Sequence, residues 1–394
     1  MSAAQQRVPR IMMVAGEASG DNLGGELLAE LRRVFPTLES FGVGGTRMIG
    51  QGLESLCDLN ELSVIGLVEV VRRLPRLVRR HRQLTALMAA QRPDLLITID
   101  LPDFNFLLAR RAKALGIPRI HYVGPQVWAW RAGRVQKLAR LLSHLLVLFP
   151  FELDSYTGSG LPVTFVGHPL ASRPQPDPEQ RLAMRHALGL RDGERLLLLL
   201  PGSRLGEIRR HLAIMVAACR RVVEASPGVR PVLAVADTLT VEDLQAVIAL
   251  EADAQTRDFF SRIGLRHGET GSLLSCADVA LASSGTVTLE AALSGTPMSV
   301  LYRVNRLTYE IGRRVIRVGH IALPNLVAGR SLVPERIQDA ATPEILAADL
   351  RALLDDGESA ARQRVGFAEI RGRLAQPARR PAEVVGDWLR AAGF

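Results

Sequence analysis

SSGTVTLEAALSGTP, residues 283–297, follows directly on the apolar run VALA at residues 279–282. The apolar run is typical of a strand buried in a parallel sheet, and residues 288–293 have the composition of a helix. Residues 284–286 therefore form a turn of small residues between the end of a strand and the start of a helix. Because the first N–H groups of a helix have no partner within it and lie at the positive end of its dipole, this turn is a candidate phosphate cradle.

The residues of this stretch favour a nucleotide as the ligand. Ser284, Gly285 and Thr286 supply backbone N–H groups, and Glu290, one helical turn later, can accept two hydrogen bonds from a ribose diol. A purely structural interpretation stays open, in which Gly285 is a tight-turn glycine and Ser284 caps the helix. Under the functional interpretation, a nucleoside diphosphate binds here and the rest of the chain supplies a second reactant and a base.

The length of the chain predicts two domains. Its 394 residues exceed one ordinary core, and 47% hydrophobic with 23% charged residues is the composition of a globular protein. A strand at residues 163–166 runs into a proline-rich segment, which is typical of a domain boundary. We therefore expect domains at residues 1–172 and 173–374, with a final helix at about 375–394 that packs back on the first domain.

Charge and cysteine content narrow the functional classes. A net charge of +9 favours anionic partners such as phosphates or an acidic membrane surface. The three cysteines lack C-x-x-C spacing, so we expect reduced thiols in the cytosol and no metal site.

No apolar run approaches the ~20 residues that a membrane span requires. The tryptophans are not interleaved with a basic tract, so we expect no nucleic-acid partner.

The first half begins with the pattern of a doubly wound sheet, in which an apolar strand at residues 11–15, a turn at 16–21 and an amphipathic helix at 23–34 follow one another. A second buried strand, DLLITID at 94–100, ends in Asp100, which has no capping function there, whereas Asp103 can cap the helix that follows. Carboxylates at the carboxyl end of a parallel strand lie where ligands bind, so we favour Asp100 as a general base. The alternative is a structural aspartate bonded to backbone amides.

Residues 62–82 predict a helix that binds a membrane surface. Apolar residues recur at helical spacing and arginines fill most other positions, which is typical of an interfacial helix on anionic headgroups. Pro75 is expected to kink or split this helix. A helix packed on the core with a solvated basic face is the alternative. The predicted membrane contacts are Ile65, Leu67, Val68, Val71, Leu74, Leu77 and Val78.

The second half repeats the opening plan. An almost all-leucine strand at residues 195–200 leads into Gly202, Ser203 and Arg204, and Arg204 is placed for a bidentate contact with a diphosphate.

Two loops add candidate ligand contacts. Residues 321–330 predict a proline-fixed loop in which Asn325 faces a uracil or ribose edge or, alternatively, is a turn asparagine. The two tryptophans of residues 124–131 either line a groove for an acyl chain or anchor their loop.

Six motifs, taken together, resemble one enzyme family. In chain order they are GEASGD at 16–21, IDLPDFN at 99–105, HYVGPQVWAWR at 121–131, LPGSR at 200–204, SSGTVTLE at 283–290 and LPNLVAGR at 323–330. Their order across nearly the whole chain is similar to that of lipid-A-disaccharide synthase. The departures are minor, because the family often has Thr at Ala18, Ser at Gly124 and a single Ala-Ser before the glycine of the fifth motif.

This resemblance implies a GT-B fold, with two Rossmann-like doubly wound parallel-sheet domains facing a cleft. It implies a metal-independent, inverting transfer without a cofactor. UDP-2,3-diacylglucosamine and 2,3-diacylglucosamine 1-phosphate (lipid X) would give a β-1,6-linked disaccharide 1-phosphate and UDP. It also implies a homodimer that is peripheral on the cytoplasmic face of the bacterial inner membrane.

The resemblance further assigns expected roles to residues. Asp100 is the catalytic base. The acceptor-side substrate contacts are Glu17, Ser19, Asp103, Asn105 and Gln126. The UDP-binding residues are Gly202, Ser203, Arg204, Ser284, Gly285, Thr286, Glu290 and Asn325.

The residues themselves agree with an inverting mechanism. Inversion requires a base near the acceptor hydroxyl, on the face opposite the leaving group. The sequence contains no D-x-D metal motif, so the helix N-terminus and Arg204 are left to stabilise the departing UDP. Two alternatives are a UDP-N-acetylglucosamine 2-epimerase-like enzyme, which does not need a membrane helix, and a non-catalytic nucleotide-sugar sensor.

Overall fold

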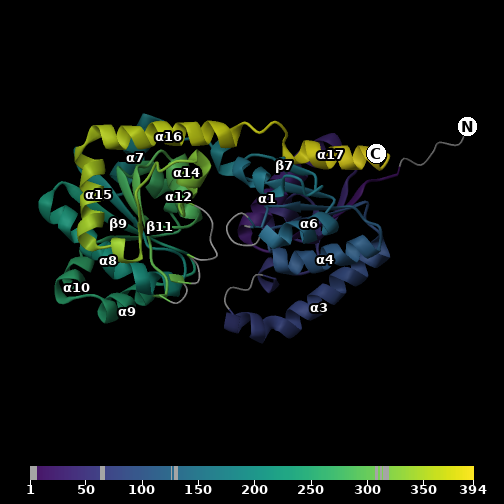
Figure 1. Cartoon of the computed structure of the whole chain (residues 1–394), viewed down its shortest axis with the longest axis horizontal. Coiled ribbons are helices and arrows are strands. Elements are labelled where there is room, and N and C mark those ends of the chain that lie inside the picture. Colours follow the sequence, from purple (N-terminus) through teal and green to yellow (C-terminus); the bar gives the residue numbers. More distant parts are fainter. Residues whose placement is uncertain are drawn as a thin grey trace, which may run out of the picture. The chain divides into compact units, whose positions relative to one another are not determined.

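The computed structural model describes residues 7–62, 67–125, 127, 132–306, 309–310, 313 and 319–394. The chain forms two compact units, the first comprising Met1–Pro169 with Gln376–Phe394 and the second Leu170–Ala375. Each unit contains one parallel sheet with helices on both of its faces (Figure 1). Among the described helices, none has both the length and the apolar character needed to cross a membrane.

The first unit is built on a seven-stranded parallel sheet. Its strands are β1 (Arg10–Ala15), β2 (Glu39–Val43), β3 (Leu53–Ser55), β4 (Leu95–Ile99), β5 (Arg119–Tyr122), β6 (His144–Val147) and β7 (Val163–Phe165). Its helices are α1 (Ala18–Val34), α2 (Thr46–Gly50), α3 (Leu67–Gln91), α4 (Pro102–Ala114), α6 (Val135–Leu141), the 3-10 helix η3 (Pro150–Tyr156) and the C-terminal α17 (Pro381–Ala391).

The core of the first unit follows from the alternation of side chains along β1. Ile11 and Met13 pack on one face against α1 and α17, while Met12 and Val14 pack on the other face against α3 and α4. All four side chains are fully buried, as expected for a strand covered by helices on both sides. The C-terminal helix α17 thus belongs to the first unit, where it contacts α1.

The second unit repeats this architecture with six parallel strands. They are β8 (Arg195–Leu200), β9 (Val229–Val235), β10 (Gly264–His267), β11 (Val279–Ser283), β12 (Met298–Tyr302) and β13 (Glu335–Ile337). The helices are α7 (Pro178–Ala187), α8 (Leu205–Ala225), α9 (Val241–Glu251), α10 (Ala254–Phe260), α11 (Thr270–Cys276), α12 (Thr286–Leu293), α14 (Leu323–Ala328), α15 (Pro343–Asp355) and α16 (Gly357–Ala375).

The strand orders identify where a ligand binds in each unit. The sheets run β3-β2-β1-β4-β5-β6-β7 and β10-β9-β8-β11-β12-β13, so the chain reverses direction across the sheet beside β1 and beside β8. In doubly wound sheets, ligands bind outside the carboxyl ends of the strands at this reversal. The candidate ligand-binding segments are therefore those after β1 and β4 in the first unit and, separately, those after β8 and β11 in the second. The predicted doubly wound α/β fold class is confirmed.

Three local predictions differ from the structure. Helix α1 begins at Ala18 and not at residue 23, so the first turn is shorter than expected. Pro75 lies inside α3, which continues to Gln91, so the helix is not split, and a kink at Pro75 stays a prediction. The predicted loop at 321–330 contains the short helix α14, because Pro324 at its start has a fixed φ that suits the first turn of a helix.

Candidate active site

The backbone after β4 turns sharply in a left-handed conformation. Asp100 has φ 53° and Leu101 has φ 45°, which are unusual values for residues other than glycine. The Asp100 N–H donates to the Tyr122 carbonyl at 2.9 Å and so continues the ladder to β5. Directly after β5, Val123 has φ 75°, a rarer conformation still for a β-branched residue. Strained residues of this kind gather at functional sites.

The turn leaves the Asp100 carboxyl half-buried at the edge of the sheet. Its Oδ1 accepts the Leu101 N–H at 2.8 Å, and no described residue donates to Oδ2. Burial raises the pKa of Asp100, and the Leu101 N–H opposes that rise in part. A carboxylate with a raised pKa is a stronger base, so the environment suits proton abstraction.

The turn after β1 lies against Leu101, the residue that follows Asp100. A Cβ at Gly16 would come within 2.7 Å of the Leu101 Cβ, so only glycine allows the two turns to approach this closely. Glu17 is half-exposed at the start of α1, and Ser19 is exposed in its first turn. The structure therefore places both beside the reversal point of the first sheet, as expected for the acceptor side.

The other predicted acceptor residues differ in exposure. Asp103 is exposed in the first turn of α4 and lies 3.7 Å from Arg134. Asn105 is fully buried, and its Nδ2 donates to the carbonyls of Ile99 at 3.3 Å and Asp100 at 2.7 Å. Gln126 lies outside the described residues.

Sequence reasoning missed one buried acid near this edge. Glu152 is 3% exposed in η3, where its Oε2 accepts the N–H groups of Leu148 and Phe149 at 3.2 and 3.0 Å. A Cβ at Gly124, just after β5, would lie 3.0 Å from its Oε1. Burial raises the pKa of Glu152 to about 8. Its position three residues after Phe149, whose N–H it accepts, is only half of a capping box because Phe149 has no side-chain acceptor, so the sequence gives no clear signal for this buried acid.

In the second unit, the turn after β8 is organised by a carboxylate. Gly202 has φ 116°, and a Cβ there would come within 2.4 Å of Glu207 Oε2. The same oxygen accepts the Ser203 N–H at 3.1 Å, and Glu207 Oε1 lies 3.6 Å from Arg204 Nη1. The Arg204 side chain is 67% exposed, so it is accessible to a ligand. Glu207 was not predicted, although a glutamate in the first turn of a helix is a recognisable capping signal.

The turn after β11 presents free N–H groups, but not from every predicted residue. The Ser284 N–H donates to the Leu301 carbonyl at 3.1 Å and its hydroxyl donates to the Ile321 carbonyl at 3.0 Å. Gly285 and Thr286 are exposed, and their N–H groups have no acceptor among the described residues. These two amides, at the start of α12, are the free donors at the predicted phosphate cradle, and the Ser284 bonds fix the turn beside them.

Two further predicted nucleotide contacts lie deeper. Burial raises the pKa of the half-buried Glu290, which the positive charge of Arg173 opposes. Asn325 is fully buried: its Nδ2 donates to the Val333 carbonyl and to Glu335, and its Oδ1 accepts the N–H groups of Leu332 and Val333. A direct contact between Asn325 and a nucleotide stays a prediction, and it would have to replace one of these four bonds.

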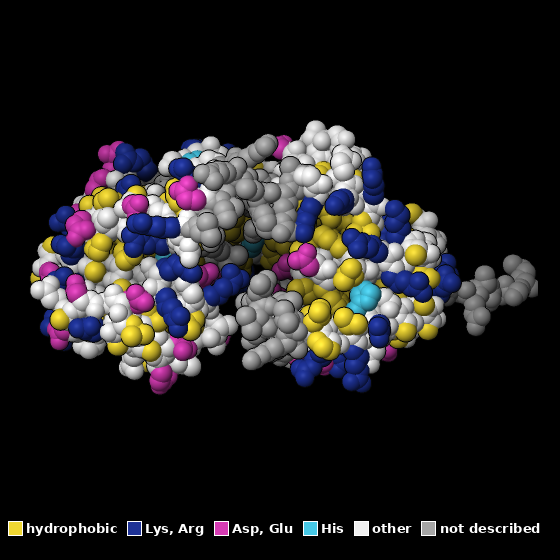
Figure 2. All heavy atoms as spheres, turned by 60° about the horizontal axis from the view of Figure 1, so that its bottom comes forward, with side chains coloured by type: hydrophobic (Ala, Val, Ile, Leu, Met, Phe, Trp, Pro, Cys, Tyr) yellow, Lys and Arg dark blue, Asp and Glu magenta, His cyan; other side chains and the backbone are white. Residues whose placement is uncertain are grey.

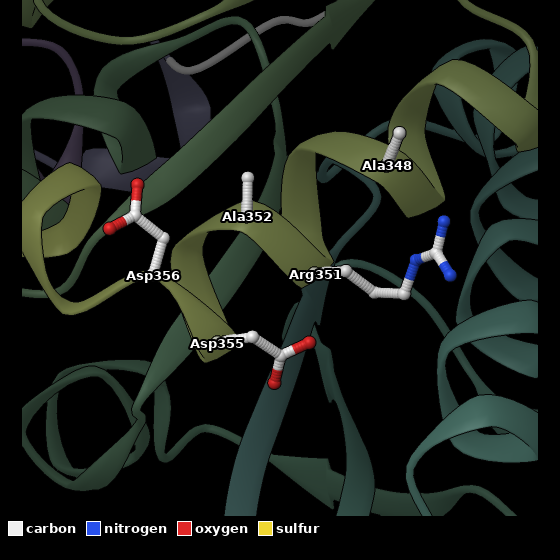
Figure 3. A pocket seen from close by; sticks show the side chains of 5 residues that line it. All are labelled: Ala348, Arg351, Ala352, Asp355 and Asp356. Atoms are coloured by element: carbon white, nitrogen blue, oxygen red, sulfur yellow. The ribbon is translucent and has the colours of Figure 1, made fainter.

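A hollow on the described surface lies away from these turns. It is shallow and lined by Ala348, Arg351, Ala352, Asp355 and Asp356 at the C-terminal end of α15 (Figure 3). Arg195, the first residue of β8, bonds to Asp355 at 3.0 Å, so this hollow lies at the amino ends of the strands. That edge is opposite to the one where doubly wound sheets bind ligands. In the described part of the chain, no cluster of His, Cys, Asp and Glu could hold a metal ion.

Comparison with known proteins gives one consistent family. The family model described as lipid-A-disaccharide synthetase matches residues 11–385. The chain is 46% identical to the lipid-A-disaccharide synthase of Alkalilimnicola ehrlichii over 98% of this chain and 99% of the relative. It is 45% identical to that of Pseudomonas aeruginosa, over 88% of this chain and 90% of the relative.

Solved structures with the same fold are more distant in sequence. A UDP-GlcNAc 2-epimerase from Neisseria meningitidis, bound to UDP-GlcNAc, aligns with a TM-score of 0.62 and 13% identity, over 97% of this chain and 100% of the other. The glycotransferase of kitacinnamycin aligns with a TM-score of 0.58 and 19% identity, over 98% and 99% of the two chains. At these identities the likeness concerns the fold alone.

Proposed function

The chain belongs to the lipid-A-disaccharide synthetase family, and we propose from this premise that it joins UDP-2,3-diacylglucosamine to 2,3-diacylglucosamine 1-phosphate. It is a glycosyltransferase of lipid A biosynthesis, built from the two parallel-sheet α/β domains of the GT-B fold. The products of the proposed reaction are a β-1,6-linked disaccharide 1-phosphate and UDP.

One observation carries the mechanism: the reversal points of the two sheets offer complementary chemistry. The first unit presents a half-buried carboxyl, Asp100, whose pKa burial raises. The second presents the N–H groups of Gly285 and Thr286 and the exposed guanidinium of Arg204. A base and an anion-binding turn are the two components that transfer from a nucleotide sugar requires.

The proposed reaction is a single displacement at the anomeric carbon of the donor sugar. Asp100 takes the proton from the acceptor hydroxyl as that oxygen forms a bond to the anomeric carbon. The bond from this carbon to the UDP oxygen breaks on the opposite face, so the configuration inverts. Arg204 and the Gly285 and Thr286 amides stabilise the negative charge that develops on the departing diphosphate.

The acceptor is proposed to bind at the first unit. Glu17 and Ser19 lie at the start of α1, directly after the strand that pairs with β4, and can bind the sugar hydroxyls or the amide groups of the acceptor. Asp103 is exposed in the first turn of α4, whereas Gln126 stays a prediction from the sequence. The proposed nucleotide contacts are Gly202, Ser203, Arg204, Gly285, Thr286 and Glu290.

We further propose that α3 binds an anionic membrane surface. Leu74 and Val78 are 51% and 41% exposed on this helix, whereas Leu77 packs against the core. Figure 2 shows hydrophobic side chains on the face of the first unit that carries α3, with Lys and Arg side chains around them. Such a surface is typical of a helix that lies in the interface of an anionic bilayer. Ile65 lies outside the described residues, as do the side chains of Leu67, Val68 and Val71.

The proposed reaction is tested by incubating the protein with both acylated glucosamine substrates. Mass analysis is expected to show a disaccharide that carries four acyl chains and one phosphate. Hydrolysed donor, or donor of unchanged mass with no disaccharide formed, would contradict the proposal. The homodimer, which also stays a proposal, is tested by light scattering at several concentrations.

A further inference from the structure

The backbone at Asp100 adopts an unfavourable conformation, so contacts with neighbouring residues must stabilise it. Asp100 and Leu101 are consecutive left-handed residues, and neither is glycine. Residues with a Cβ avoid this region because the Cβ approaches the following carbonyl oxygen. Without fixed contacts, the turn would relax and move the Asp100 carboxyl.

Asn105 supplies the polar contacts that hold this turn. Its Nδ2 donates to the carbonyls of Ile99 and Asp100 at 3.3 and 2.7 Å, and its own N–H donates to the Leu101 carbonyl at 3.0 Å. Three consecutive carbonyl groups are therefore bonded to one residue of α4. Asn105 is 0% exposed, so water cannot replace these bonds.

Close packing fixes the same turn from the other side. A Cβ at Gly16 would lie 2.5 Å from Leu101 Cδ2, so the turn after β1 is in direct contact with the Leu101 side chain. Leu101 also packs against the core formed by α3 and α4. The left-handed pair is thus held between a bare glycine backbone and the Asn105 amide.

We propose that Asn105 is a positioning residue, which sets the geometry of Asp100 and does not itself contact substrate. This inference rests on the proposed function, in which Asp100 is the base. The direction of the bonds supports it, because both Nδ2 contacts are donations to main-chain carbonyls and Asn105 Oδ1 is buried without a hydrogen-bond partner among the described residues. An aspartate at this position would have the same shape but would place oxygen against two carbonyl oxygens.

The test compares Asn105→Asp and Asn105→Ala with the wild-type protein. Both variants are expected to lower kcat by about 100-fold, as misplacement of a catalytic group by ~1 Å does. The KM for the nucleotide sugar and the Kd for UDP should change less than twofold, because the nucleotide binds at the second unit. A kcat within twofold of wild type in Asn105→Asp would overturn the proposal.

A matched control separates positioning from loss of stability. Thr98 is 1% exposed on β4, two residues before Asp100, and its hydroxyl bonds to His121 Nδ1 at 2.8 Å. Thr98→Val removes a buried hydrogen bond from the same strand without touching the turn. We expect it to lower the Tm while kcat is unchanged. A kcat loss in Thr98→Val equal to that in Asn105→Ala would contradict a specific positioning role.

The failure of this inference can be told apart from the failure of the proposed function. If Asp100→Asn retains its rate, Asp100 is not the base and the proposed mechanism is wrong. If Asp100→Asn is inactive while Asn105→Asp is fully active, only the positioning role is wrong.

Discussion

Two features of the structure act in opposite directions on the pKa of Asp100. Its carboxyl is half-buried, which raises its pKa, and it accepts one backbone N–H, which limits that rise. The left-handed conformation of Asp100 and Leu101 costs on the order of 1–3 kcal/mol per residue. A fold that tolerates this cost at a strand end places the carboxyl where an ordinary turn would not.

Substitution of the carboxylate tests its chemical role. Asp100→Asn keeps the shape and the acceptor for the Leu101 N–H but removes the basic oxygen. We expect turnover to be abolished while the Kd for UDP is unchanged, measured by product formation and calorimetry. A variant with near-normal turnover would rule out Asp100 as the base.

The raised pKa of Asp100 predicts the pH dependence of catalysis. The base acts in its deprotonated form, so activity is lost as the pH falls through the pKa of Asp100. Because kcat/KM reports the free enzyme, its acidic limb should lie above the ordinary aspartate pKa of 3.8. An acidic limb at or below that value would show that burial does not control this carboxyl.

Glu152 predicts how stability depends on pH. Its folded pKa of about 8 lies above the ordinary 4.5, so the protonated form is favoured by folding. This contribution to stability is fully present below pH 4.5 and is lost as the pH rises through about 8, at about 1.4 kcal/mol per pH unit.

Glu152→Gln mimics the protonated form and is neutral at every pH, so the variant should not lose stability as the pH rises. We expect its free energy of unfolding to increase relative to wild type between pH 5 and pH 8, measured by urea unfolding. Glu54→Gln, an exposed substitution in the same unit, is the matched control. A difference between Glu152→Gln and wild type that is constant with pH would refute the assignment.

The positions of the candidate residues could be predicted from the sequence only where a strand ends just before them. Asp100 and Arg204 follow apolar runs, and the structure places both at the carboxyl edges of the sheets. Asn105, Glu152 and Glu207 act through contacts with neighbouring turns. Such contacts depend on packing between segments distant in the sequence, or on a capping pattern that has no catalytic meaning by itself.

At the scale of single elements, the turn between β11 and α12 gives a specific test. Gly285 has an extended backbone with φ 167°, and a Cβ there would meet no atom within 4 Å. The fold itself therefore does not require glycine at this position. The proposed function does, because a diphosphate must approach the backbone closely.

Gly285→Val is expected to fold normally but to bind UDP at least about tenfold more weakly, a loss of ~1.4 kcal/mol. Calorimetry gives the Kd, and thermal unfolding checks the fold. Gly271→Val, at another glycine with open space around it, is the control and should bind UDP normally. Unchanged UDP affinity in Gly285→Val would place the diphosphate elsewhere.

Helix α3 is the second element with a testable function. Leu74→Ser combined with Val78→Ser removes the two exposed apolar side chains and should reduce sedimentation with anionic liposomes at low salt. Leu250→Ser in α9, where the side chain is 79% exposed, is the control for a loss of exposed apolar surface. Equal sedimentation of the double variant and the wild type would contradict membrane binding by α3.

At the scale of the whole molecule, the two units share one strand order up to the sixth strand. Long apolar runs such as residues 195–200 predicted the central strands, because strands buried on both faces are apolar throughout. The inner strands β2 and β6 of the first sheet were not predicted. Neither were the edge strands β3, β10 and β13. Their residues are largely half-buried or exposed and carry polar side chains, so they lack the apolar pattern.

The central claim is that the second unit holds a uridine diphosphate sugar while the first activates an acceptor alcohol. The most direct measurement is UDP release from UDP-2,3-diacylglucosamine, with and without lipid X. We predict that release requires lipid X and equals the amount of disaccharide formed. UDP release at the same rate without lipid X, or none with it, would contradict the account.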